Sequence, residues 1–234
     1  MSETLTIDLG QGASFDCFVA RPKHTAPAPV IVVVQEIFGV NEGIRGKCRW
    51  LADHGFIAVA PDLFWRLEKN VELTDKTKEE WNKAFDLMNR FDIDQGIRDL
   101  QAVTDKARTL DGANGKVGNM GYCLGGKISY LMAARTDTDA SVSYYGVGLE
   151  ELLGEAEGIK KPLMLHIAEL DKFSTPEKRD AVVNGLRDNP HVTTHVYDGM
   201  DHAFTRVGGD HYDEAAATIA DTRTVEFFAR HLKG

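Results

Sequence analysis

Long apolar runs are scarce in this chain of 234 residues, where stretches such as Val30–Val34 and Phe56–Ala60 span only five residues each. A helix that crosses a bilayer needs about 20 apolar residues, so the sequence does not predict a membrane protein. Each run instead has the length of a buried strand. Because Met1–Thr4 has neither a basic start nor a following apolar stretch, we expect no secretory signal.

Cysteine is also rare, and Cys17, Cys48 and Cys123 are an odd number that includes no Cys-x-x-Cys pair. The simplest account is three reduced thiols in a cytoplasmic protein. No Cys/His cluster has the spacing of metal ligands, so we expect neither a metal nor a cofactor.

Positive charge is in deficit, because 27 Lys and Arg residues oppose 36 Asp and Glu residues, which gives a net charge of −9. This balance disfavours a bulk attraction to nucleic acid or anionic lipid, and we expect neither partner. It is still compatible with a small basic pocket for an anionic substrate. For the oligomeric state, the sequence indicates only a monomer or a small homo-oligomer.

What the chain does contain is a regular alternation of strand and helix patterns. The predicted strands cover residues 4–9, 14–20, 30–34, 56–60, 117–122, 141–145, 162–168 and 193–197. The predicted helices cover residues 41–54, 75–90, 94–110, 124–135, 176–187 and 212–232. This order predicts an α/β fold with an N-terminal hairpin and a mostly parallel central sheet covered by helices on both faces. Without a repeat or a break in composition, residues 1–234 are expected to form a single domain.

The segment around Cys123 carries the most chemical information. Gly121-x-Cys123-x-Gly125 stands between a strand and a helix and is the thiol form of the Gly-x-Ser-x-Gly nucleophile elbow. A residue at such a strained turn needs small neighbours two positions away on either side. In return, its sulfur projects from the carboxyl edge of the sheet, and the backbone N–H of Leu124 can face an oxyanion.

Two other interpretations of this segment stay open. Gly121 to Lys127 nearly matches a phosphate-binding loop, but Ile128 stands where a Ser or Thr should hold Mg²⁺. Alternatively, Cys123 is a buried structural cysteine beside packing glycines, since free cysteine is commonly buried.

The elbow hypothesis requires an acid and then a histidine later in the chain, each on a loop after a strand. Asp171 follows the predicted strand 162–168, and His202 follows the predicted strand 193–197. An imidazole can exchange a proton with the sulfur or the leaving group, and a carboxylate fixes its tautomer. The other histidines lie inside strands, in linkers or at helix ends, and are weaker candidates.

These motifs resemble those of the dienelactone hydrolase family of α/β-hydrolases over nearly the whole chain. The resemblance rests on Gln35-Glu36-Ile37-Phe38-Gly39, Pro61-Asp62-Leu63-Phe64, Gly121-Tyr122-Cys123-Leu124-Gly125-Gly126, Tyr144-Tyr145-Gly146, Asp171 and Asp201-His202-Ala203-Phe204. It implies the α/β-hydrolase fold and a catalytic triad of Cys123, Asp171 and His202.

The resemblance also implies roles for residues outside the triad. In the family, a glutamate at the position of Glu36 holds the resting thiol and takes its proton when substrate arrives, and the N–H of Ile37 is the second oxyanion donor. Arg206 would grip a substrate carboxylate, helped by its fork-shaped guanidinium, and would share one side with His202 if that loop is helical. Tyr145 would contact substrate.

The sequence departs from the family pattern at Trp81, where well-studied members use a second arginine. Trp81 is therefore assigned here to the substrate pocket, although with Phe85 and Met88 it also forms an apolar helix face typical of core packing. Arg66 or Arg90 could replace the missing arginine, but nothing in the spacing shows it.

The resemblance implies a hydrolase of aromatic compound catabolism that acts on a small enol-lactone or activated ester, with or without a carboxylate, through an acyl-thioester. A thiolate leaves more readily than a simple alkoxide, so the reaction needs a good leaving group. A non-catalytic or redox-sensing thiol protein on the same fold is the alternative, and nucleotide binding is a third hypothesis.

Overall fold

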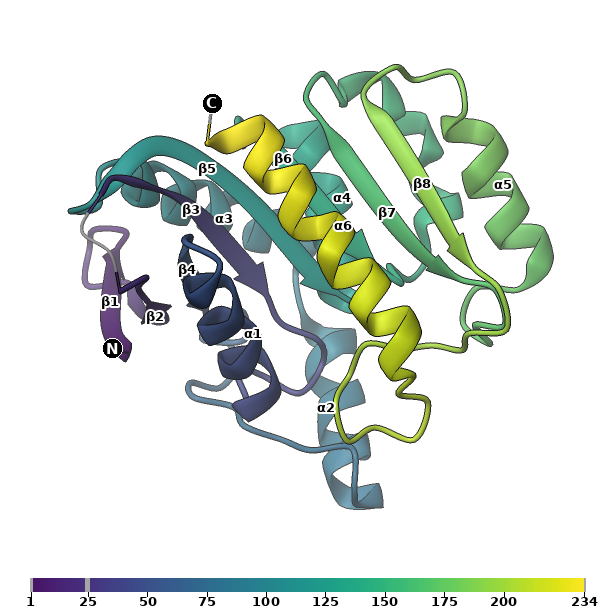
Figure 1. Ribbon diagram of the computed structural model, residues 1–234. Helices are drawn as coiled ribbons and strands as arrows, with labels where there is room; N and C mark the ends of the chain where they lie inside the picture. The colour runs from purple at the N-terminus through teal and green to yellow at the C-terminus, as the bar shows by residue number, and fades with distance from the viewer. Residues whose placement is uncertain (1, 24–25, 234) are drawn as a thin grey trace. The chain divides into compact units, whose positions relative to one another are not determined.

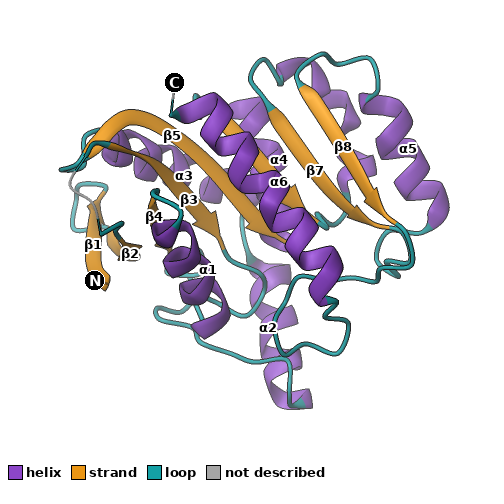
Figure 2. Ribbon diagram, in the orientation of Figure 1, coloured by secondary structure: helices purple, strands orange, loops and turns teal. Residues whose placement is uncertain are grey.

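The computed structural model describes residues 2–23 and 26–233, and the chain divides into two compact units, Met1–Asn119 and Met120–Gly234. Each unit consists of strands that alternate with helices (Figure 2). The expectation of a single domain stays a prediction.

The strands of the first unit begin with the predicted hairpin of β1 (Ser2–Asp8) and β2 (Ser14–Ala20), which pair antiparallel. Its turn contains Gln11 at φ +52, between two glycines that also have positive φ. β2 pairs antiparallel with β4 (Ile57–Pro61), and β4 pairs parallel with β3 (Ala28–Val34). Every residue of β3 and β4 is buried, as their continuous apolar runs predict.

The helices of the first unit are α1 (Glu42–Asp53), α2 (Lys78–Arg90) and α3 (Ile93–Arg108). Each begins after a polar residue whose side chain accepts a hydrogen bond from an N–H of the first turn; Asn41 does this for α1. Beyond the end of α1, Gly55 takes the positive φ that commonly terminates a helix. α1 and α3 contact opposite faces of β3 and β4 (Figure 2).

The strands of the second unit follow β5 (Ala113–Tyr122), the strand along which the chain passes from one unit to the next. β6 (Ala140–Tyr144), β7 (Leu163–Ala168) and β8 (Val192–Tyr197) lie in that order and pair parallel. β6 and β7 are entirely buried. α4 (Leu124–Arg135) begins directly after Cys123 and packs against β6.

Two further helices of this unit are α5 (Pro176–Leu186) and α6 (Glu214–Leu232), and α6 crosses β6 and β7 on the face opposite α4 (Figure 1). The 3₁₀ helix η1 (Leu149–Gly158) was not predicted. Its hydrogen bonds span three residues, so it lacks the 3.6-residue period by which an α-helix is recognised in a sequence.

The predicted fold class is confirmed, because the strand pairs β3–β4, β6–β7 and β7–β8 are parallel and helices cover both faces in each unit. Most element boundaries lie within two or three residues of their predicted positions, and the helix at 124–135 was predicted to the residue. Within residues 2–23 and 26–233, no helix is long and apolar enough to cross a membrane.

Candidate active site

Cys123 occupies a strained turn between β5 and α4, as the elbow motif predicts. Its backbone has φ +55 and ψ −113, a conformation that side-chain-bearing residues rarely adopt. Its N–H donates to the carbonyl of Tyr144 at the end of β6, at 3.1 Å, and its own carbonyl accepts from the N–H of Lys127, also at 3.1 Å. The strain is therefore held on both sides by backbone hydrogen bonds, while the thiol stays partly exposed.

The small residues around Cys123 are required by close contacts. A Cβ on Gly121 would lie 2.2 Å from the carbonyl oxygen of Gly125, and a Cβ on Gly126 would lie 2.6 Å from that of Tyr144. Neither position can therefore hold a larger side chain without moving the backbone. Leu124 is the first residue of α4, so its N–H belongs to the helix N-terminus, where backbone donors point outward and favour negative charge.

Asp171 lies three residues beyond β7, almost fully buried at 4% exposure. Its Oδ1 accepts from the N–H of Phe173 at 2.8 Å, and its backbone carbonyl accepts from the N–H of Ser174 at 3.0 Å. These local bonds fix the carboxylate and leave Oδ2 to accept from Nδ1 of His202 at 2.7 Å. The acid predicted from chain order is therefore the partner of the predicted histidine.

His202 follows β8 and brings the other two candidate residues together within the second unit. Asp171 occupies Nδ1, and the Cys123 side chain also interacts with the ring. Burial opposes a charge on this ring, but the hydrogen bonds to Asp171 and Cys123 outweigh that effect and raise the pKa of His202 to about 10. The ring therefore favours the imidazolium form at neutral pH.

Two aromatic rings enclose the His202 imidazole. Phe173 lies edge-to-face with it at 4.8 Å between centroids, and Tyr145 does the same at 5.1 Å. Tyr145 is nearly fully buried, has φ +37, and shares a 3.0 Å hydrogen bond between its hydroxyl and Thr205. Phe173 is half exposed, so it presents an apolar face beside the imidazole. Sequence analysis did not identify Phe173, since its position follows from the turn at Asp171.

Arg206 lies on the loop that follows His202, but that loop is not helical. Residues 202–205 form a turn in which Ala203 has φ +64, and the N–H of Arg206 donates to the carbonyl of Ala203 at 2.9 Å. The helical spacing that would have placed Arg206 on the side of His202 is therefore absent. The side chain of Arg206 is partly buried.

Glu36 and Ile37 lie in the first unit, directly after β3, and both are buried, at 7% and 3% exposure. The preceding Gln35 is fully buried and its side-chain oxygen accepts from the N–H of Leu63 at 3.1 Å. That bond fixes the chain direction as it leaves the strand. A carboxylate with so little exposure needs partners inside the protein.

Trp81, on α2 of the first unit, packs edge-to-face on Phe38 at 5.0 Å and against Phe85 at 5.5 Å. Its indole N–H donates to the carbonyl of Asp75 at 3.0 Å. Phe38, on which Trp81 packs, directly follows Ile37 in the sequence.

The two arginines considered as replacements for an arginine at position 81 are both engaged elsewhere. Arg66 forms a two-pronged ion pair with the buried Asp99, at 2.8 Å for each prong. Arg90 pairs with Asp86 one turn earlier on the same helix, at 2.7 Å. Neither guanidinium is therefore placed to substitute for it.

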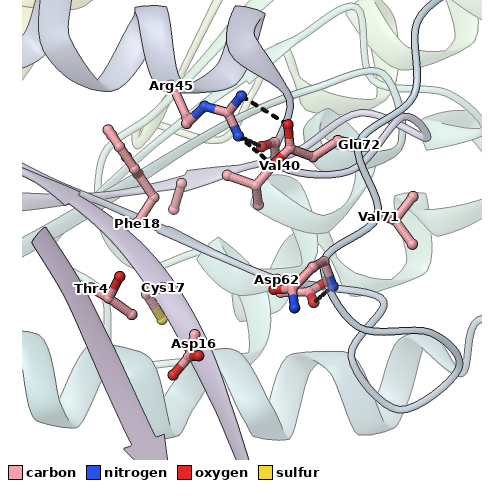
Figure 3. Close-up of a pocket in the computed structure, with 11 residues that line it drawn as sticks. Thr4, Asp16, Cys17, Phe18, Val40, Arg45, Asp62, Val71 and Glu72 are labelled. Atoms are coloured by element: carbon pink, nitrogen blue, oxygen red, sulfur yellow. Dashed lines mark hydrogen bonds and ion pairs between the residues drawn. The ribbon is translucent and has the colours of Figure 1, made fainter. Parts of the chain in front are cut away.

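A cavity of about 200 Å³ opens in the first unit between the hairpin and the loops after β3 and β4 (Figure 3). Its lining includes Cys17, Asp16 and Asp62, together with Arg45, which is paired with Glu72. Burial raises the pKa of Asp62 and, more strongly, that of Cys17. None of the predicted site residues lines this cavity.

Comparison with known proteins identifies the family. A model of the dienelactone hydrolase family matches residues 15–232. The chain is 48% identical over 229 residues to a relative from Azospirillum brasilense assigned as a carboxymethylenebutenolidase, covering 97% of this chain and 98% of that one. It is 38% identical to the carboxymethylenebutenolidase of Pseudomonas putida, covering 98% and 97%.

A solved structure from Klebsiella pneumoniae, assigned as a dienelactone hydrolase, matches with a TM-score of 0.86 at 30% identity and covers 98% of both chains. With the family model and the relatives, this match confirms the resemblance and the fold that the motifs predicted. The chain therefore belongs to the dienelactone hydrolase family and is a hydrolase with the α/β-hydrolase fold.

Proposed function

We propose that this protein hydrolyses enol-lactones or activated carboxylic esters through an acyl-thioester on Cys123. One observation carries the proposal: within the second unit, His202 is hydrogen-bonded to the buried Asp171 carboxylate, and its interactions with Asp171 and the Cys123 side chain raise its pKa to about 10. The names of the relatives, carboxymethylenebutenolidases, agree with it in substrate class.

The first half of the reaction forms the thioester. The Cys123 thiolate attacks the carbonyl carbon, a C–S bond forms, and the C–O bond to the leaving enolate breaks. The leaving oxygen takes a proton from the His202 imidazolium, whose raised pKa of about 10 reflects its ability to hold that proton beside a negative sulfur. Asp171 keeps the ring in the tautomer that presents Nε2 to the sulfur.

The second half consumes water. His202, now neutral, takes a proton from a water molecule, the hydroxide oxygen bonds to the acyl carbon, and the C–S bond breaks to restore the thiolate. In both halves the N–H groups of Leu124 and Ile37 stabilise the oxyanion. Glu36 takes the thiol proton when substrate arrives and returns it to the sulfur after the C–S bond has broken.

The thiolate limits the range of substrates. Because it leaves more readily than a simple alkoxide, the first tetrahedral intermediate returns to substrate unless the other leaving group is good. Enol-lactones and aryl esters meet that condition, whereas fats and peptides do not. We propose that Arg206 binds a carboxylate where the substrate has one. We also propose that Trp81 and Tyr145 contact the substrate with their aromatic side chains.

The proposal extends to organisation and location: residues 1–234 act as one catalytic domain in the cytoplasm, on a small-molecule substrate, without nucleic acid or membrane.

The decisive experiment is intact-mass spectrometry after a brief exposure to a 4-nitrophenyl ester, with Cys123→Ser as the matched control. We expect an acyl adduct on Cys123 of the wild type that decays as product forms, and no thioester in the variant. Turnover without an adduct, or an adduct elsewhere, contradicts the mechanism. A panel of enol-lactones with and without a carboxylate then identifies the substrate, and equal rates across esters with different leaving groups would contradict the partitioning argument.

A further inference from the structure

The backbone of His202 is held on both sides by a pair of side chains that the reaction scheme does not use. On one side, its N–H donates to Oδ1 of Asp201 at 2.6 Å. On the other, its carbonyl oxygen lies 3.1 Å from Nδ1 of His211, nine residues further along. The two side chains also face each other, with Nε2 of His211 3.5 Å from Oδ2 of Asp201. Together they enclose the peptide groups of His202 in a ring of contacts.

We infer that Asp201 and His211 form a clip that positions His202. This inference rests on the proposed function, since it concerns the placement of the imidazole that serves Cys123. His211 touches neither the thiol nor the Asp171 carboxylate in this scheme. It is a positioning residue, and it acts through the backbone of its neighbour.

The His211 ring makes two contacts in the clip. Its Nδ1 lies 3.1 Å from the His202 carbonyl oxygen, and its Nε2 lies 3.5 Å from the Asp201 carboxylate. Because the carbonyl oxygen can only accept, Nδ1 carries the proton of that hydrogen bond. Loss of the ring therefore removes a contact to the backbone of His202 and a contact to Asp201 together.

The contacts of the His211 ring are with Asp201 and with the backbone of His202. The side chain of His211 is about one-third exposed, at 36%. Its exposure also means that its replacement leaves the core of the unit intact.

The clip matters because the remaining contacts of His202 are directional. Nδ1 must stay on Asp171 at 2.7 Å while Nε2 stays on the sulfur. Ala203, the next residue, has φ +64, so the turn is strained and depends on its surroundings for its shape. A displacement on the order of 1 Å at a catalytic group can cost as much as about 100-fold in rate.

The test compares His211→Ala, His211→Asn and Asp201→Asn with the wild type. Asparagine at 211 places an amide N–H where Nδ1 lies, so it restores the contact with the carbonyl. His191→Ala is the matched control, because His191 is an exposed histidine of the same unit away from this loop. The readouts are kcat and KM, measured separately, and the rate at which iodoacetamide alkylates Cys123.

We expect His211→Ala to lower kcat about three- to tenfold with KM changed less than twofold, since positioning affects the reacting groups more than binding. His211→Asn should recover most of the loss, because its amide N–H restores the contact with the carbonyl. Asp201→Asn keeps an acceptor oxygen for the His202 N–H, so it should lower kcat less than His211→Ala does.

A kcat of His211→Ala equal to that of His191→Ala, or no recovery in His211→Asn, would overturn the inference, as would a loss confined to thermal stability. The alkylation rate separates this outcome from a failure of the proposed function. If the wild type hydrolyses no lactone or ester, the proposed function fails, but the clip still predicts slower alkylation of Cys123 in His211→Ala. Cys17 and Cys48 are buried, so alkylation reports on Cys123.

Discussion

Two histidines of the second unit, His202 and His166, are both buried and both use their two ring nitrogens, yet their partners differ in kind. His202 lies between a carboxylate and a thiol, at the end of a loop after β8. His166 lies inside β7, where Nδ1 contacts the Tyr197 hydroxyl at 2.7 Å and Nε2 contacts the Thr224 hydroxyl at 3.0 Å. The partners of His202 are a carboxyl group and a thiol, which can carry a charge, whereas the partners of His166 are hydroxyl groups, which stay neutral near pH 7.

The difference shows what makes a buried histidine suited to catalysis. Around His166, the Thr224 hydroxyl also meets that of Tyr144 at 2.6 Å, so the network joins β6, β7 and α6. Such a network holds α6 against β6 and β7, and the groups that contact the His166 ring itself are neutral hydroxyls. Around His202, charged partners stabilise the imidazolium, and the neighbouring thiol is partly exposed. Burial alone does not distinguish the two rings; the chemistry of their partners does.

The largest expected effect concerns the charged partner of His202. Asp171→Asn should lower kcat by about 10³- to 10⁴-fold, because the amide no longer stabilises the imidazolium and favours the wrong tautomer. Steady-state kinetics on an aryl ester measure this, with Asp188→Asn, an exposed aspartate of the same unit, as the control. A decrease in kcat of less than tenfold would contradict the claim that a charged partner distinguishes His202 from His166.

A smaller effect, on stability and not on rate, is expected at His166. His166→Ala should lower the free energy of unfolding by about 2 to 4 kcal/mol, because it leaves a cavity and removes two buried hydrogen bonds. The kcat of the folded fraction should change less than about threefold. His195→Ala is the matched control, because His195 lies on the half-buried strand β8 and stacks on His166 with ring centroids 5.9 Å apart. This substitution should lower the free energy of unfolding by less than about 1 kcal/mol. Urea unfolding and steady-state kinetics on the same samples test this prediction. A fall in kcat without a fall in the free energy of unfolding would contradict it.

The smallest effect expected is the pH dependence of stability that comes from the charge on His202. Its folded-state pKa of about 10 lies above the ordinary value of about 6.5, so the stability from its pairing is fully present below pH 6.5. That stability declines as the pH rises and is lost above about pH 10. The melting temperature of the wild type should therefore exceed that of Asp171→Asn by a few °C at pH 7, with the gap closing by pH 10.5. If this difference in melting temperature widened as the pH rose, it would contradict the conclusion that His202 is positively charged at neutral pH.

The local patterns of the sequence were sufficient to predict much of the candidate site. The steric demand for Gly121 and the chain order of Cys123, Asp171 and His202 follow from a strand, a tight turn and a helix, which are properties of neighbouring residues. In the structure, a Cβ added at Gly121 would lie 2.2 Å from a backbone oxygen, and Asp171 and His202 are hydrogen-bonded at 2.7 Å. The condition stated for Arg206, a helical loop after His202, is not met, because Ala203 turns the chain. The role of Arg206 stays a prediction.

The sequence by itself determined the alternation of strands and helices and the family, because apolar periodicity, caps and the Gly-x-Cys-x-Gly turn act over a few residues at a time. Only the tertiary structure decided that a second buried histidine, His166, is held by the hydroxyls of Tyr197 and Thr224. It also decided that His211 returns to hold the carbonyl of His202. These hydrogen bonds join residues from 9 to 58 positions apart. The packing of strands and loops selects the partners, so no fixed spacing in the sequence predicts them.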